Sequence, residues 1–249
     1  MDVVLIVNPQ AGGGRARRVL PAALAQLQTG GCRPQVHFTA NGREPATVAA
    51  QAAGGGASLV VAVGGDGHAS AVAGGLLGSE SALGLLPVGS ANDYARTIGL
   101  DPADIDGAVR ALLQPRLRRL DVVRVETAGE QRHILNVGGA GFDSVVAATA
   151  ERIPVLRGAG RYVLAVVREL PRYRAADFQI ELDGVSYHRR AMVVIVANGP
   201  TYGGGMRVAP AARLASGHFD VCIVAELSPL RFLLAFPRVF RGTHIDHPE

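Results

Sequence analysis

The chain has 249 residues, of which 48% are hydrophobic, 18% charged and 5% aromatic, and this apolar content excludes intrinsic disorder. The formal net charge of +4 favours anionic partners such as nucleotides and acidic lipid headgroups. All 25 basic residues are arginines, which excludes a Walker A phosphate loop, a protein kinase and a Schiff-base enzyme, because each of these needs a lysine.

Features of cellular location point to a cytoplasmic protein. No apolar run approaches the ~20 residues that a membrane span needs. Met1 leads directly into a strand-like run, so no signal peptide is expected. Two cysteines cannot form a disulfide framework, and Cys32 and Cys222 are expected to be reduced core residues. The arginines are dispersed and aromatic residues are few, which argues against nucleic-acid binding.

The first half of the chain alternates short apolar runs with alanine-rich stretches. The pattern predicts strands over 3–7, 35–39, 59–63 and 83–87, and helices over about 15–28, 45–53, 69–77 and 91–98. The run 59–63 is apolar on both faces, which is typical of a central strand in a parallel sheet covered by helices on each side. The alternation therefore predicts an open, Rossmann-like parallel α/β domain over residues 1–119.

The pattern changes near Leu120. Strand-like runs are predicted over 121–125, 134–137, 178–182, 187–196 and 219–224, with helices over about 160–169 and 228–240. The dipeptide Asp183-Gly184 predicts a tight turn between two of these strands. We therefore expect a second, mainly antiparallel domain over residues 120–249, joined to the first at the basic stretch 116–119.

A glycine-rich turn follows the central strand. Gly64, Gly65 and Gly67 let backbone N–H groups approach an anion, and the next helix directs its positive end to the same place. Asp66 lies inside this turn, which suits a bound phosphate only if a cation or a transferable proton separates the two negative charges. The turn therefore indicates Mg²⁺ or a hydroxyl substrate. The alternative is a structural turn with a helix-capping aspartate.

Two further loops are expected at the same rim of the sheet. The segment 8–14 follows the first strand and contains Asn8, Gly12 and Gly13, and the segment 87–93 follows the fourth strand and contains Ser90 and Asn92. Ligands of open α/β folds bind at the carboxyl ends of the strands, so the three loops together predict a phosphate site. For the third loop the alternative is a capping box formed by Ser90 and Asp93.

These motifs resemble the diacylglycerol kinase catalytic-domain family, which includes the sphingosine kinases and is related to NAD kinases and phosphofructokinases. The matching segments are 7–9 with the glycines that follow, 64–67, 86–96, Asp121, 135–137, 141–143, Asn198, 202–206 and 209–211. They span nearly the whole chain in the order of the family.

The resemblance implies two domains, an ATP-binding site near the glycine-rich turn and a β-sandwich second domain on the lipid side. The implied nucleotide contacts are Asn8, Thr39, Gly65, Asp66, Gly67 and Ser90, and the rim loops add Gly12, Gly13, Gly64, His68 and Asn92. Asp66 is the implied catalytic residue at the γ-phosphate and a magnesium ligand, with Asp121 as a second member of the magnesium–water network. For Asp121 the alternative is a surface ion pair with Arg118 or Arg119, and for His68 it is a solvated loop residue.

The chain departs from the family pattern in three places. Residues 68–71 read His-Ala-Ser-Ala where relatives usually have Thr-Ile-Asn-Glu, and residues 215–218 lack the acidic pair implicated in a structural magnesium site. Relatives continue beyond the position of Glu249 with strands and an acidic residue that some bacterial members use as a base, so a truncation relative to the family is expected. If that base is missing, Asp66 must serve.

The leading interpretation is an ATP- and Mg²⁺-dependent lipid kinase that phosphorylates a hydroxyl of a diacylglycerol-like or sphingoid lipid at the inner membrane surface. The alternatives are a nucleotide-binding module that has lost transfer chemistry, and an NAD kinase-like enzyme. The oligomeric state stays open, with a homodimer among the options. The segment 231–238 is amphipathic and is interpreted as a docked surface helix rather than a bilayer contact, and His244, Asp246 and His247 as a solvated tail rather than metal ligands.

Overall fold

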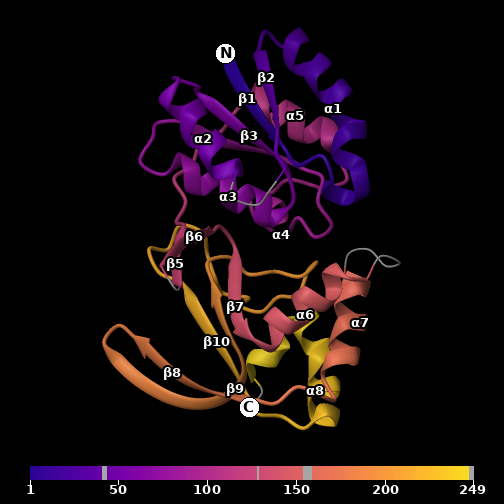
Figure 1. Cartoon of the computed structure of the whole chain (residues 1–249), viewed down its shortest axis with the longest axis vertical. Coiled ribbons are helices and arrows are strands. Elements are labelled where there is room, and N and C mark those ends of the chain that lie inside the picture. Colours follow the sequence, from indigo (N-terminus) through magenta and orange to yellow (C-terminus); the bar gives the residue numbers. More distant parts are fainter. Residues whose placement is uncertain (41–43, 128, 154–158, 247–249) are drawn as a thin grey trace. The chain divides into compact units, whose positions relative to one another are not determined.

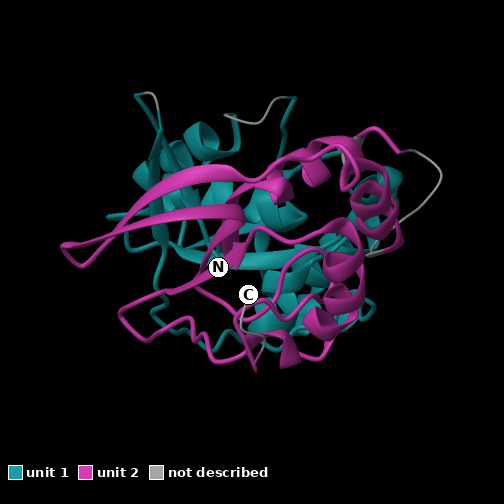
Figure 2. Cartoon of the chain, turned by 90° about the horizontal axis from the view of Figure 1, so that it is seen from below, with its two compact units in different colours: residues 1–135 teal, residues 136–249 magenta. Residues whose placement is uncertain are grey.

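The computed structural model describes residues 1–40, 44–127, 129–153 and 159–246. Within these residues the chain divides into two compact units, residues 1–135 and 136–249, which Figure 2 colours separately. The boundary lies after Leu135, later than the expected join near Leu120, because the hairpin that we assigned to the second domain contacts a helix of the first unit.

Unit 1 is built on a parallel sheet of four strands in the order β2-β1-β3-β4 (Figure 1). The strands are β1 (Asp2–Val7), β2 (Arg33–Phe38), β3 (Leu59–Gly64) and β4 (Ala82–Pro87). Every residue of β3 is buried, as its apolar run predicted. The parallel α/β prediction for the N-terminal half is confirmed, and all four predicted strands are present.

Helices cover both faces of this sheet. The helices of unit 1 are α1 (Ala11–Thr29), α2 (Glu44–Gly54), α3 (Asp66–Leu76), α4 (Asp93–Thr97) and α5 (Ile105–Leu113). α1 and α5 share one core cluster with Val3, Leu5 and Val7 of β1. α2 and α3 pack against each other, so closely that a side chain at Gly75 would overlap the carbonyl oxygen of Ala46.

Helix α5 was not predicted from the sequence. Its N-cap Asp104 accepts a hydrogen bond of 2.7 Å from Gly107 N, and its buried face has helical spacing through Ala108, Val109 and Leu112. Both signals were readable in the sequence. The hairpin β5 (Val123–Thr127) and β6 (Glu130–Ile134) completes unit 1 and contacts α3, where the His133 ring lies 2.6 Å from where a Cβ at Gly74 would stand.

Unit 2 contains an antiparallel sheet ordered β10-β9-β7, with β8 paired to the other half of β9. The strands are β7 (Val137–Gly141), β8 (Ala176–Leu182), β9 (Val185–Ala197) and β10 (Asp220–Ala225). Asp183 and Gly184 both have positive φ, so the predicted tight turn between β8 and β9 is confirmed. The antiparallel character predicted for the C-terminal half is also confirmed.

Helices pack against this sheet around one apolar core. They are α6 (Phe142–Glu151), α7 (Ala159–Glu169) and α8 (Pro229–Ala235), followed by the 3-10 turns η1 (Phe236–Phe240) and η2 (Thr243–Asp246). The core includes Phe142, Val146, Val166 and Ile195. The helix α6 was not predicted, because the valines and threonine among residues 145–149 lower its helix propensity and its burial decides its conformation instead.

Candidate nucleotide site

The three predicted loops meet at the carboxyl ends of β1, β3 and β4. The amide of Asn8 donates to Val63 O at 3.0 Å, which joins the first loop to the end of β3. Asn8 also uses its side chain, since Oδ1 accepts from Gln10 N at 3.0 Å. The loop that begins at Asn8 is thus fixed both to its neighbour and to itself.

Glycine conformation sets the path of this first loop. Gly12, Gly13 and Gly14 have φ values of 59°, 64° and 84°, so the chain makes a left-handed turn before the regular helix begins. The expected helix start near Arg15 agrees with this change of hand. A Cβ at Gly12 would overlap the carbonyl oxygen of Val88, so only glycine allows the first loop to contact the third.

The second and third loops touch through glycine backbones. A Cβ at Gly89 would overlap Gly65 Cα, and Val88 N and Gly89 N donate to Gly64 O at 3.0 and 3.2 Å. Asn92, with φ of 55°, accepts from Gly89 N and donates back to Gly89 O at 2.9 and 2.8 Å. The residue before α4 is Asn92, so Asn92 and not Ser90 is the N-cap of this helix.

Asp66 joins the second loop to the start of α4. Its Oδ1 accepts from Tyr94 N at 2.8 Å and its Oδ2 from Asp93 N at 3.1 Å. These donors are the first amides of α4, which lack partners within their own helix. Asp66 thus caps a helix, as the alternative interpretation held, but a helix that follows a different strand. Each carboxylate oxygen keeps a second lone pair for a further donor or a cation.

The side chain of His68 is neither solvated nor available to a phosphate, because it bonds to β1. Its Nε2 lies 2.9 Å from Ile6 O, so Nε2 carries the proton and donates to β1. The ring packs 2.6 Å from where a Cβ at Gly64 would stand. Burial lowers the pKa of this histidine, against a smaller opposing effect of the bond to Ile6. The solvated-loop alternative is wrong. In the neutral form Nδ1 has no proton, so His68 holds the turn in place and has no donor left for a phosphate.

The remaining predicted contacts differ in exposure. Thr39 is buried, and its N and Oγ1 both donate to Val7 O, at 2.9 and 3.2 Å. Ser90 and Gly67 are exposed. Ser70, which replaces a polar family position, accepts from Leu135 N at 3.3 Å and so binds the end of the β5–β6 hairpin to α3. Gly13 is exposed as well, so Ser90, Gly67 and Gly13 are the exposed members of the predicted contacts.

The residues present suit Mg²⁺ only together with phosphate oxygens. Among the described residues no group of three or more histidine, cysteine or acidic side chains could hold a metal by itself. Mg²⁺ commonly takes one or two carboxylates and completes its shell with substrate phosphates and water, and Asp66 has the lone pairs for this. Asp121 is half-buried two residues before the start of β5, and its role as a magnesium ligand stays a prediction.

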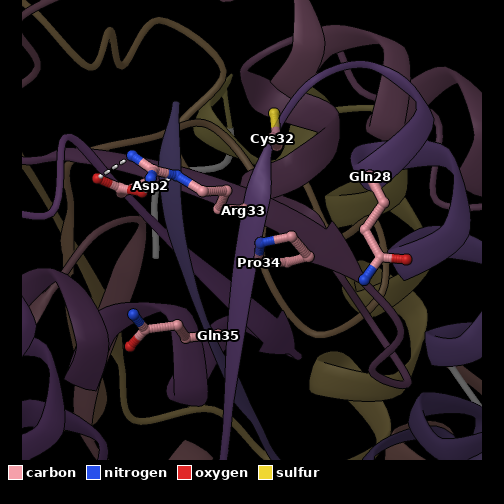
Figure 3. Close-up of a pocket in the computed structure, with 6 residues that line it drawn as sticks. All are labelled: Asp2, Gln28, Cys32, Arg33, Pro34 and Gln35. Carbon is pink, nitrogen blue, oxygen red and sulfur yellow. Dashed lines mark hydrogen bonds and ion pairs between the residues drawn. The ribbon is translucent and has the colours of Figure 1, made fainter.

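A shallow hollow of about 580 Å³ lies at the other end of the same sheet (Figure 3). It is lined by residues from the amino-terminal ends of β1 and β2 together with Gln28 of α1 and Cys32, and the exposed side chains of Asp2 and Arg33 form an ion pair of 2.9 Å. Because the glycine loops follow the carboxyl ends of the strands, this hollow is not the predicted phosphate site.

Unit 2 contains a second polar cluster, which the sequence analysis did not assign. Asp143, in the first turn of α6, has a buried Oδ1 without a hydrogen-bond partner in the described part of the chain. Burial raises the pKa of this carboxyl, and burial and the charge of Asp143 together raise the pKa of Tyr202 and of Tyr173. Gly139 makes room for the carboxylate, since a Cβ there would overlap Asp143 Oδ2. The only sequence signal was the segment 141–143, quoted above as a family match.

Both units match known family models. Residues 2–125 match the diacylglycerol kinase catalytic domain, and residues 136–249 match the YegS C-terminal NAD kinase beta sandwich-like domain. The chain is 29% identical to a diacylglycerol kinase of Mycobacterium tuberculosis over 99% of this chain and 81% of the relative, and 27% identical to one of Bacillus subtilis over 97% and 80%. It is similar to the crystal structure of a diacylglycerol kinase from Bacillus anthracis, with a TM-score of 0.72, 25% identity and coverage of 99% of this chain and 78% of that one.

Proposed function

The chain belongs to the diacylglycerol kinase catalytic-domain family, and on this premise we propose that it is a lipid kinase that transfers the γ-phosphate of ATP, with Mg²⁺, to a hydroxyl of a diacylglycerol-like or sphingoid lipid. The relatives named diacylglycerol kinase support the diacylglycerol-like substrate in particular. No helix in the described part of the chain is long and apolar enough to cross a membrane.

The observation that carries the proposal is the meeting of three glycine-bearing loops around Asp66. Backbone contacts through Gly12, Gly65 and Gly89 leave no space for side chains, so the surface offered to a ligand there is mostly backbone. Backbone N–H groups at helix starts bind phosphates. A carboxylate at the same place has a use in phosphoryl transfer, where an alcohol must lose its proton.

The chemistry follows from these groups. The lipid hydroxyl oxygen forms a bond to the γ-phosphorus while the bond to the β–γ bridging oxygen breaks, and that electron pair leaves with ADP. Asp66 takes the hydroxyl proton. Mg²⁺, held by Asp66 and the phosphates, would neutralise negative charge on the transferred group in a chain that has no lysine for this task. Rigid loops keep the reactants in position, which supplies much of the acceleration.

We assign a hydrogen-bond donor of a ligand in unit 2, and not the reacting hydroxyl that Asp66 deprotonates, to Asp143. Its Oδ1 is an acceptor that no described residue satisfies, and a buried acceptor without a donor costs about 1–3 kcal/mol. A ligand group that donates a hydrogen bond to this oxygen would remove the cost on binding. The phenols of Tyr202 and Tyr173 stay protonated at neutral pH, because burial and Asp143 raise the pKa of each.

The direct test is transfer of label from [γ-³²P]ATP to lipid in mixed micelles. We expect the full chain to label a diacylglycerol and Asp66→Asn to lower the rate by at least about 100-fold, since a group that acts on the transferring phosphate contributes this much. Asp101→Asn is the matched control, because Asp101 is an exposed aspartate of unit 1 whose Oδ1 also accepts a backbone amide, from Ala103 at 2.8 Å.

The same experiment separates the alternatives. Equal labelling by the wild type and Asp66→Asn would exclude the proposed role of Asp66. Nucleotide binding in calorimetry without lipid labelling would favour a module that has lost transfer chemistry, as the replaced residues 68–71 suggest. Formation of NADP from NAD and ATP would reveal an NAD kinase-like enzyme.

A further inference from the structure

The outer face of α8 exposes three leucines. Leu230 and Leu234 are 69% and 71% exposed, and Leu233 is 40% exposed. Their spacing of i, i+3 and i+4 places them together on one side of the helix. Large apolar side chains gathered in this way usually mark a contact with a partner or a membrane.

The exposed leucines are not the face by which α8 packs on unit 2, because phenylalanines make that contact. Phe232 and Phe236 stack with ring centroids 5.7 Å apart, and Phe232 meets Phe142 of α6 edge-on at 5.4 Å. Phe240 continues the stripe through η1. The Ser228 hydroxyl caps the helix by accepting from Arg231 N. The expected docked helix is therefore present, and its docking uses the phenylalanine face and leaves the leucine face outward.

The net charge of the segment around α8 indicates which kind of surface the leucine face contacts. The segment 228–246 contains the exposed arginines Arg231, Arg238 and Arg241 and one acidic residue, Asp246, a balance of 3 − 1 = +2. Two copies of such a face would repel each other, whereas an anionic surface would be attracted. Arginine and leucine on a short surface helix are typical of segments that lie in the interface of a bilayer with anionic lipids.

We propose that the leucine face of α8, with the arginines of the segment 228–246, docks unit 2 on the surface of an anionic phospholipid bilayer. The leucines enter the boundary between headgroups and acyl chains while the arginines contact lipid phosphates. The inference rests on the proposed function, because a kinase that takes its substrate from a bilayer has a use for such a contact. In Figure 1 α8 and the following turns (yellow) lie in unit 2, together with α6 and α7.

The test is co-sedimentation of the full chain with vesicles, without ATP or diacylglycerol. We expect binding to vesicles of phosphatidylglycerol and phosphatidylcholine, weaker binding in high salt, and little binding to phosphatidylcholine alone. Leu230→Asn with Leu234→Asn should lower the partition constant at least about tenfold. Arg238→Gln should lower it about fivefold.

Leu117→Asn is the matched control, because Leu117 is 73% exposed and also lies among arginines, but in unit 1. Unchanged binding by the double leucine variant, or equal loss with Leu117→Asn, would overturn the proposal, as would equal binding to neutral vesicles. A wild-type dimer that the leucine variant turns into a monomer would assign the face to protein contact instead.

A kinase assay on two forms of the substrate separates failure of the docking proposal from failure of the proposed function. The double leucine variant should phosphorylate a short-chain diacylglycerol dispersed in detergent at the wild-type rate and lose activity only on vesicles. Loss on both substrates together with wild-type vesicle binding would overturn the docking role.

Discussion

The polar side chains of the two units differ in whether they have hydrogen-bond partners within the chain. At the rim of unit 1, Asp66 and His68 each have a hydrogen-bond partner in another segment of the chain, and Asn92 bonds to Gly89 within its own loop. In unit 2, Asp143 Oδ1 and Asn136 Oδ1 are buried with no partner in the described residues. The difference indicates that the fold preorganises the proposed phosphate site, whereas the polar cluster of unit 2 has an acceptor that a ligand could use.

The largest expected effect concerns the backbone contacts of unit 1. Gly12→Ala places a Cβ on the Val88 carbonyl oxygen in addition to the strain of a positive φ, so it should cost about 2–5 kcal/mol of unfolding free energy and weaken ATP binding. Gly14→Ala, at a positive φ with open space, should cost about 1–2 kcal/mol. Chemical denaturation and calorimetry measure both. Equal losses would mean that the contact with Val88 is not what fixes the loop.

A smaller effect of opposite sign is expected at Asp143. Asp143→Asn should stabilise the ligand-free protein by about 1 kcal/mol at neutral pH, because it removes a buried charge, and should lower lipid phosphorylation about tenfold or more without changing ATP affinity. Glu181→Gln, an exposed acid of the same unit, is the control and should change neither quantity.

The pH dependence of this stabilisation follows from the raised pKa of Asp143. The folded protein binds the proton of the Asp143 carboxyl more tightly than the unfolded chain, in which the pKa of this carboxyl is 3.8. Wild-type stability therefore decreases as the pH rises from 3.8 through the raised folded pKa, and it stays lower above that value. The advantage of Asp143→Asn should vanish below pH 3.8. An advantage that persists there would show that the gain has another cause.

The smallest expected effect is a dependence of the unfolding free energy on pH that arises from His68. Burial lowers its folded pKa below 6.5, so the unfolded chain takes up the proton first and stability falls as the pH drops from 6.5 through the folded pKa. His68→Gln can still donate to Ile6 O and should remove this slope in thermal unfolding between pH 5 and 7. His188→Gln, on the exposed β8–β9 hairpin, should leave it unchanged. If the stability of His68→Gln still falls between pH 7 and pH 5, another titratable group causes the pH dependence.

The sequence by itself determined the class of each unit and the place of the three glycine-bearing loops. Apolar runs such as 59–63 specify buried parallel strands, and glycines directly after them specify loops at one rim, because both depend on residues adjacent in the chain. Only the tertiary structure decided that Asp66 caps α4, that His68 bonds to β1 and that the half-buried Asp143 lies near two tyrosines. These contacts join segments such as 66 and 94 or 6 and 68, and no local periodicity records which distant group a side chain will meet.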